Sequence, residues 1–179
     1  WHLRRAAQHG RIHSMHAAIP CETFSVAVDD EDACRSAEQP MGISGLEPRR
    51  AERVFMSNAL VYFTLDLARD VIAAGGAVTI ENPAPRGDVT LPQVYWEAKA
   101  HHANLFRTRP VLDYAAETRS VEVVVPLCAF GAPMQKYIML LASPGLAGGL
   151  APINGIICEH ANHEETAYGV TSTGRPAAL

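Results

Sequence analysis

The stretch AAIPCETFSVA, residues 17–27, joins an apolar run to a proline, a cysteine and an acid. The run over 11–19 predicts a strand, and Cys21 follows it directly. A second stretch, AVTIEN at residues 77–82, predicts another short strand that ends in Glu81 and an amide. In open α/β sheets, ligands bind beyond the carboxyl ends of the strands. We therefore expect Cys21 and Glu81 to lie along the same edge of one sheet.

The rest of the chain alternates predicted helices and strands. The pattern predicts a long loop over 28–50, helices over 51–74 and 91–106, and strands over 120–128 and 136–143. Strands that alternate with helices indicate an α/β fold with a mostly parallel sheet. On the first helix, apolar residues recur at spacings of three and four, which predicts one buried stripe. The stripe comprises Val54, Asn58, Val61, Leu65, Ala68 and Ile72, widened by Leu60, Phe63, Leu67 and Val71.

Composition limits the class of protein. The chain has 179 residues and is 48% hydrophobic and 19% charged, which is typical of a globular domain. We expect one core over 1–145 and a C-terminal extension over 146–179 that carries a Cys/His cluster and is partly disordered. The net charge of −4 gives no general basic field, so any binding to DNA would use local patches.

Cysteine usage and hydropathy indicate the compartment. The four cysteines are widely spaced and form no CxxC pair, which favours a reducing intracellular compartment, nuclear or cytoplasmic. No apolar run approaches the length of a transmembrane helix, so no membrane partner is expected.

The pairing of a thiol with an acid has a chemical meaning. A thiolate can add to an electron-poor ring, and a nearby carboxyl can stabilise the charge that develops on a ring nitrogen. The alternative for Cys21 is a small buried hydrophobic residue, and for Glu81 an ordinary surface acid.

Three segments resemble the DNA (cytosine-5) methyltransferases, in the order that this family has them. PCETFS (20–25) resembles the Pro-Cys-Gln loop, and IENP (80–83) resembles the Glu-Asn-Val strand end. FGAPMQKYIMLLAS (130–143) resembles the segment in which Phe-Gly-Val-Pro-Gln-Asn-Arg runs into a strand. A closer likeness is to the methyltransferase-like domains of retroelements and phage-like elements of protists and algae. The segments ENPAPRGD (81–88), HHANLFRTRPVL (101–112) and LCAFGAPMQK (127–136) and the late Cys/His cluster carry it.

The resemblance implies a Rossmann-like methyltransferase fold, S-adenosylmethionine as cofactor and DNA as partner. Cys21 would attack carbon 6 of a flipped cytosine, and Glu81 would hold the ring nitrogen and the exocyclic amine. Flipping is needed because the target atom is inaccessible in a duplex. The remaining substrate-binding residues would be Pro20, Phe24, Ser25, Asn82, Pro83 and Lys136.

Three departures from the family pattern matter. Glu22 stands where the family has Gln, and an acid there should raise the pKa of the Cys21 thiol. Lys136 and Tyr137 stand where the family has arginines. No glycine-rich turn follows a first strand, so we expect the first cofactor-binding unit to lie upstream of Trp1, in an N-terminally truncated chain. The alternative is a degenerate, non-catalytic relic of the fold that binds nucleic acid or a protein partner.

A separate cluster near the C-terminus offers metal ligands. CEHANHEE places Cys158, His160 and His163 within six positions, and Cys128 could complete a set of four. Thiolate and imidazole ligands suit zinc. The spacing matches no standard zinc finger, so the sequence favours an exposed, metal-free turn over a zinc site.

Overall fold

The computed structural model describes residues 2–25 and 32–164 and shows a mixed α/β fold. Four strands form one sheet in the order β1-β2-β4-β3. They are β1 (Ser14–Ala18), β2 (Ala77–Pro83), β3 (Val121–Pro126) and β4 (Tyr137–Ala142). β1 pairs with β2 in parallel, whereas β4 is antiparallel to both β2 and β3. The α/β class is confirmed, but the prediction of a mostly parallel sheet is wrong, and the sheet is not clearly of the Rossmann type.

The connection between β3 and β4 explains the difference. A parallel return needs a crossover of about a dozen residues or more, usually a helix. Residues 127–136 hold only a short 3-10 helix, Leu127–Phe130, so the chain turns back as an antiparallel hairpin. Because β4 opposes both neighbours, β1, β2 and β3 all end at one side of the sheet. We call this side the carboxyl edge; it runs through Ala18, Pro83, Pro126 and Tyr137.

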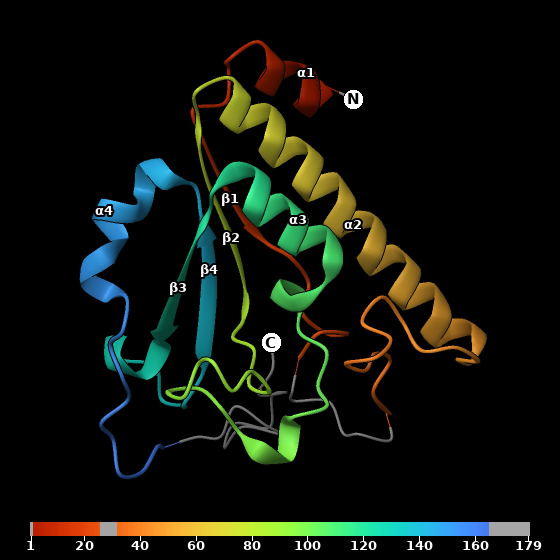
Figure 1. The fold of residues 1–179 in the computed structure, drawn as a ribbon, viewed down its shortest axis with the longest axis vertical. Helices are drawn as coiled ribbons and strands as arrows, with labels where there is room; N and C mark the ends of the chain where they lie inside the picture. Colours follow the sequence, from red (N-terminus) through yellow and green to blue (C-terminus); the bar gives the residue numbers. More distant parts are fainter. Residues whose placement is uncertain (1, 26–31, 165–179) are drawn as a thin grey trace.

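Two helices cover one face of the sheet (Figure 1). They are α2 (Pro48–Ala73) and α3 (Arg109–Thr118). A short helix, α1 (His2–Gln8), packs against the end of α2, and α4 (Ala147–Leu150) lies beside β3 (Figure 1). α2 begins with a proline in its first turn, where the missing N–H costs nothing. Gly75 ends it at φ 84°, a left-handed conformation that favours glycine.

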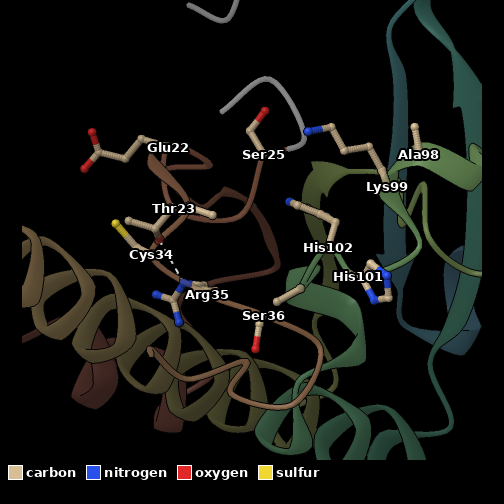
Figure 2. A pocket seen from close by; sticks show the side chains of 12 residues that line it. Glu22, Thr23, Ser25, Cys34, Arg35, Ser36, Ala98, Lys99, His101 and His102 are labelled. Carbon is tan, nitrogen blue, oxygen red and sulfur yellow. Dashed lines mark hydrogen bonds between the residues drawn. The ribbon is translucent and has the colours of Figure 1, made fainter. Parts of the chain in front are cut away.

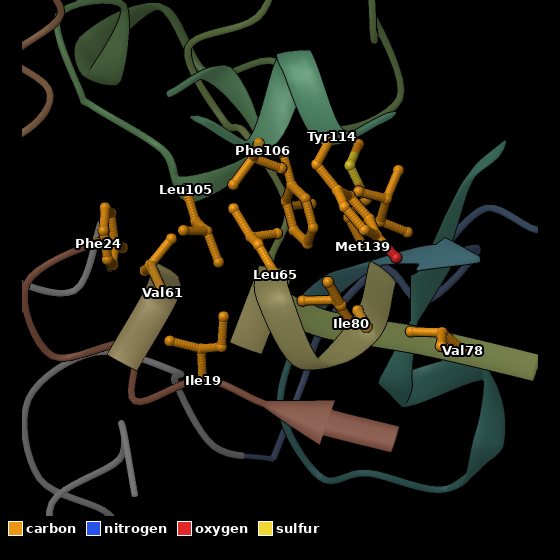
Figure 3. Packing of buried hydrophobic residues seen from close by; sticks show 14 of the residues in the cluster. Ile19, Phe24, Val61, Leu65, Val78, Ile80, Leu105, Phe106, Tyr114 and Met139 are labelled. Carbon is orange, nitrogen blue, oxygen red and sulfur yellow. The ribbon is translucent and has the colours of Figure 1, made fainter. Parts of the chain in front are cut away.

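The core lies between α2, α3 and the sheet. Val61 and Leu65 of α2 pack toward Ile80 of β2, and Leu105 and Phe106 close the cluster from the other side (Figure 3). The buried stripe of α2 is as predicted for Val54, Val61, Leu65, Leu67, Ala68 and Val71.

Leu60 and Phe63 were predicted to widen this stripe and do not. Their side chains are 43% and 41% exposed. Phe55, Met56 and Tyr62 are exposed on the same helix. A helix that is apolar on most sides shows no single preferred face, so spacing alone does not select the buried one.

The prediction of a helix over 91–106 is also wrong. This segment consists of turns with two short 3-10 helices, Glu97–Lys99 and Leu105–Arg107. Asp88 accepts hydrogen bonds from the backbone and side chain of Thr90, and Asn104 accepts one from the backbone of Phe106. Such local side-chain bonds compete with helix formation.

The C-terminal extension is only partly described. It contains two further 3-10 helices, Pro144–Leu146 and Ala151–Ile153, on either side of α4. The predicted disordered tail falls mainly on 165–179, which lies outside the described residues. In the part of the chain that the structure describes, no helix combines the length and apolar character needed to cross a membrane.

Candidate functional site at the carboxyl edge

The loop after β1 is fixed against β2. Cys21 is half-buried and opens a turn in which the backbone N–H of Phe24 donates to the Cys21 carbonyl at 2.8 Å. The amide of Asn82, which is fully buried in β2, donates to the carbonyl of Ile19 at 2.8 Å. Glu81 lies opposite Ala18, the last residue of β1. Cys21 therefore follows β1 and Glu81 lies within the neighbouring parallel strand β2, close to its end, so both belong to the carboxyl edge.

Three charged side chains act on the Cys21 thiol. Burial raises its pKa most, the positive charge of Lys136 lowers it, and the charges of Glu81 and Glu22 raise it. All three charges are thus within electrostatic range of the sulfur. The net effect raises the pKa of Cys21 above its ordinary value, which keeps the thiol protonated at neutral pH. That Cys21 and Glu81 contact one base remains a prediction.

The other predicted substrate-binding residues differ in how exposed their side chains are. Pro20 is exposed and Ser25 half-buried, whereas Asn82 and Pro83 are buried. Phe24 is 0% exposed and belongs to the core, with the guanidinium carbon of Arg35 3.8 Å from its ring centre. Phe24 therefore packs in the core beneath the loop and does not line an open pocket.

A pocket of about 190 Å³ lies beside this loop (Figure 2). Glu22, Thr23 and Ser25 line one side, and the facing segments contribute Cys34, Arg35, Ser36, Lys99, His101 and His102. Arg35 is buried, which lowers its pKa to about 10, so it remains charged at neutral pH. Its Nε atom donates to Thr23 at 3.1 Å. The loop that carries Cys21 thus shares a wall with a pocket whose surface is mostly apolar and whose lining includes the charged residues Glu22, Arg35 and Lys99.

Two residues at this edge escaped the sequence analysis. Asn104 donates to the carbonyl of Pro83 at 2.7 Å and fixes the loop after β2. Arg86 lies between the rings of Trp96 and Tyr137, at 5.9 and 5.7 Å from their centres. Arg86 lies in a loop with no hydrophobic period, and Asn104 falls in the segment 91–106 that was predicted as a helix, so neither position gave a signal in the sequence.

The four predicted metal ligands come together. One ligand atom from each of Cys128, Cys158, His160 and His163 lies within 4.8 Å of all the others. The Cys158 sulfur is 3.2 Å from Nε2 of His163 and 3.6 Å from Nδ1 of His160. Cys128 follows β3 directly, so the cluster belongs to the carboxyl edge. This Cys/His cluster could hold a metal ion.

The two thiols of the Cys/His cluster differ in acidity. Burial raises the pKa of Cys158, but hydrogen bonds from His160, Cys128 and Gln135 outweigh it and lower that pKa to about 6. Burial and the neighbouring Cys158 raise the pKa of Cys128. Cys158 is therefore the more acidic of the two thiols.

Nothing in the described residues supports binding of S-adenosylmethionine. Among them, no glycine-rich turn follows β1 or β2. The first glycine after β2 is Gly87, where an added Cβ would meet the carbonyl oxygen of Lys99 at 2.5 Å, so this turn is packed against the chain itself. Comparison with protein-family models, curated proteins and solved structures finds no match for this chain, so its function is argued from the geometry of the carboxyl edge.

Proposed function

We propose that this chain is the base-binding part of a DNA methyltransferase-like domain of the cytosine-5 type. The observation that carries the proposal is the placement of Cys21 and Glu81 after and within two adjacent parallel strands, with Lys136 in electrostatic range. A thiol, a carboxyl and a cation are the groups that covalent addition to a pyrimidine requires.

The chemical step follows from these groups. The Cys21 thiolate forms a bond to carbon 6 of the cytosine, and the electron pair of the 5,6 double bond moves toward carbon 5 and the ring nitrogen. Glu81 hydrogen-bonds that nitrogen and the exocyclic amine, which stabilises the developing charge. Carbon 5 then takes a proton from water. In the reverse direction carbon 5 loses a proton and the thiolate leaves, so the hydrogen on carbon 5 exchanges with solvent.

The surroundings suit a nucleic acid as partner. The pocket beside the Cys21 loop is lined by the charged side chains of Arg35 and Lys99, and Glu22 is the acid among its described lining residues. Arg35 is 4% exposed and bonds Thr23 and the Pro40 carbonyl, so Lys99 is the cation on the pocket wall that could contact a phosphate, without reading the base. Binding of single-stranded DNA is expected to be stronger than binding of duplex, because no base then has to be unpaired.

Methyl transfer itself needs a donor. The resemblance implies S-adenosylmethionine, but nothing in the described residues supports its binding, so the proposal covers recognition and activation of the base alone. The raised pKa of Cys21 favours a second candidate, a non-catalytic relic that binds DNA without adding to it. The two candidates differ in one measurable step, the addition of the thiolate.

Release of tritium separates them and needs no methyl donor. Single-stranded DNA containing 5-tritiated cytosine is incubated with the chain at pH 8 to 9, and tritiated water is counted. We expect release by the chain, and loss of release in Cys21→Ala and Glu81→Gln. Arg109→Ala is the control, because its side chain is 85% exposed and lies on α3. DNA binding without release identifies the relic, and absence of both contradicts the proposed partner.

A further inference from the structure

We propose that Cys128, Cys158, His160 and His163 bind one structural Zn²⁺ ion, which fastens the C-terminal segment to the carboxyl edge. This inference is independent of base binding at Cys21. It concerns residues from two places in the chain: the turn after β3, and a segment thirty positions later that has no regular secondary structure.

The spacing of the ligand atoms agrees with one tetrahedral ion. Zinc lies about 2.3 Å from sulfur and about 2.0 Å from nitrogen, which puts the two ligand atoms roughly 3.6 Å apart across a tetrahedral ion. The Cys158 sulfur lies 3.6 Å from Nδ1 of His160 and 3.2 Å from Nε2 of His163. The longest separation in the set is 4.8 Å, which small side-chain rotations can shorten.

The chemistry of the ligands selects the ion. Two thiols and two imidazoles are the ligands of Cys₂His₂ zinc sites, whereas Mg²⁺ and Ca²⁺ require oxygen. Four protein ligands fill the tetrahedron and leave no position for water or substrate, which is the character of a structural site.

Contacts around the cluster already orient its ligands. The backbone N–H of Cys158 donates to the hydroxyl of Tyr137 at 2.9 Å, and Gln135 hydrogen-bonds the Cys158 thiol. Upstream, the side-chain oxygen of Asn154 accepts from the backbone of Val124 in β3 at 3.2 Å. The segment is thus held against β3 and β4 at two points, and the ion would add a third. Such outer partners are what metal ligands need to keep their orientation.

The location of the Cys/His cluster connects a bound ion to other residues of the carboxyl edge. Gln135, which contacts the Cys/His cluster, is the neighbour in sequence of Lys136, whose charge acts on Cys21. Tyr137, which holds Cys158, also carries Arg86 over its ring. An ion at the cluster therefore stabilises the turn that supplies Lys136 and the loop that follows β2.

The first test is metal content. The full chain is purified under reducing conditions without chelator and analysed by inductively coupled plasma mass spectrometry. We expect one zinc per chain, and less than about a tenth of that in Cys158→Ser and His163→Gln, because each variant leaves three ligands where a closed structural site has four. Cys21→Ser and His101→Gln are the matched controls and should keep the full amount.

A second measurement covers variants that fail to fold. His163→Cys should keep zinc, because Cys₃His is also a zinc ligand set. The wild-type chain, stripped with chelator and titrated with Co²⁺, should develop the visible bands of tetrahedral thiolate coordination at one equivalent. Zinc below a tenth per chain after reconstitution of folded protein would overturn the proposal. So would full zinc in both ligand variants, or a Cys128–Cys158 disulfide in protein kept under reducing conditions.

Discussion

The side-chain amide of Asn82 donates a buried hydrogen bond of 2.8 Å to the backbone carbonyl of Ile19. This bond joins the end of β2 to the residue that precedes Pro20 and Cys21. It therefore assigns Asn82 a positioning role, since a side chain that is 0% exposed and already engaged with Ile19 is not available to solvent. The position of Cys21 therefore depends on the strand that carries Glu81.

Replacement of Asn82 should cost stability. Asn82→Ala leaves the Ile19 carbonyl buried without a donor, which we expect to lower the free energy of unfolding by about 1–3 kcal/mol. Asn58→Ala is the matched control, because Asn58 also donates to a carbonyl at 2.8 Å but is only half-buried and lies on α2. Urea denaturation of both variants checks the difference. An equal loss in the two would show that the Asn82 bond has no special weight.

The reactivity of Cys21 should rise steeply with pH. Burial and the charges of Glu81 and Glu22 raise the pKa of its thiol, so the thiolate forms only above the ordinary range. Glu22→Gln removes a charge that raises the pKa, and should speed alkylation at pH 8. Lys136→Met removes a charge that lowers the pKa, and should slow it. The rate is measured with iodoacetamide and site-resolved mass spectrometry; opposite signs for the two variants would contradict the arrangement.

Two arginines two positions apart should differ in their effect on stability. Arg107 bonds both Asp88 and Glu122, and its side chain is 30% exposed. Arg107→Ala leaves two partly buried carboxylates without an ion-pair partner, which should cost roughly 1–3 kcal/mol of unfolding free energy. Arg109→Ala removes only an exposed pair with Asp113, so its effect should be much smaller. Thermal denaturation of both variants decides whether the first loss is the larger.

The two sides of α2 should respond differently to substitution. Leu65→Ala removes a side chain that is 1% exposed and should cost about 2–5 kcal/mol. Phe63→Ala, two positions earlier, removes a side chain that is 41% exposed and should cost less than about 1 kcal/mol. Urea denaturation compares them, and a comparable loss at Phe63 would mean that its side of the helix is covered in solution.

The sequence predicts most of the strands and the main helix within a few residues, because apolar runs and spacings of three and four reflect local geometry. It does not predict strand direction: the antiparallel placement of β4 depends on the short connection 127–136. Among the site residues, the shared edge of Cys21 and Glu81 follows from parallel strands. The burial of Phe24 cannot be predicted from the sequence, because it arises from packing against Val61 and Arg35, which are distant in the chain.

The Cys/His cluster is a second case in which contacts between distant segments cannot be read from the sequence. Its spacing matches no standard finger, and the sequence therefore favoured a metal-free turn. The structure brings Cys128 to within 4.8 Å of the other three ligand atoms because β3 ends at the edge where the later segment returns. The sequence named all four residues, but a ligand set drawn from distant segments has no standard spacing, so whether it holds a metal ion stays a prediction.

The distances along the chain between paired strands imply an order of assembly. Residues 127–136 join β3 to β4, whereas residues 19–76 separate β1 from β2. Closing a longer loop costs more entropy, and local contacts form sooner. We expect the hairpin of β3 and β4 to form early and β1 to dock last. The loop that carries Cys21 then reaches the end of β2 only in the final step of folding, so partly folded chains carry this thiol away from the carboxyl edge.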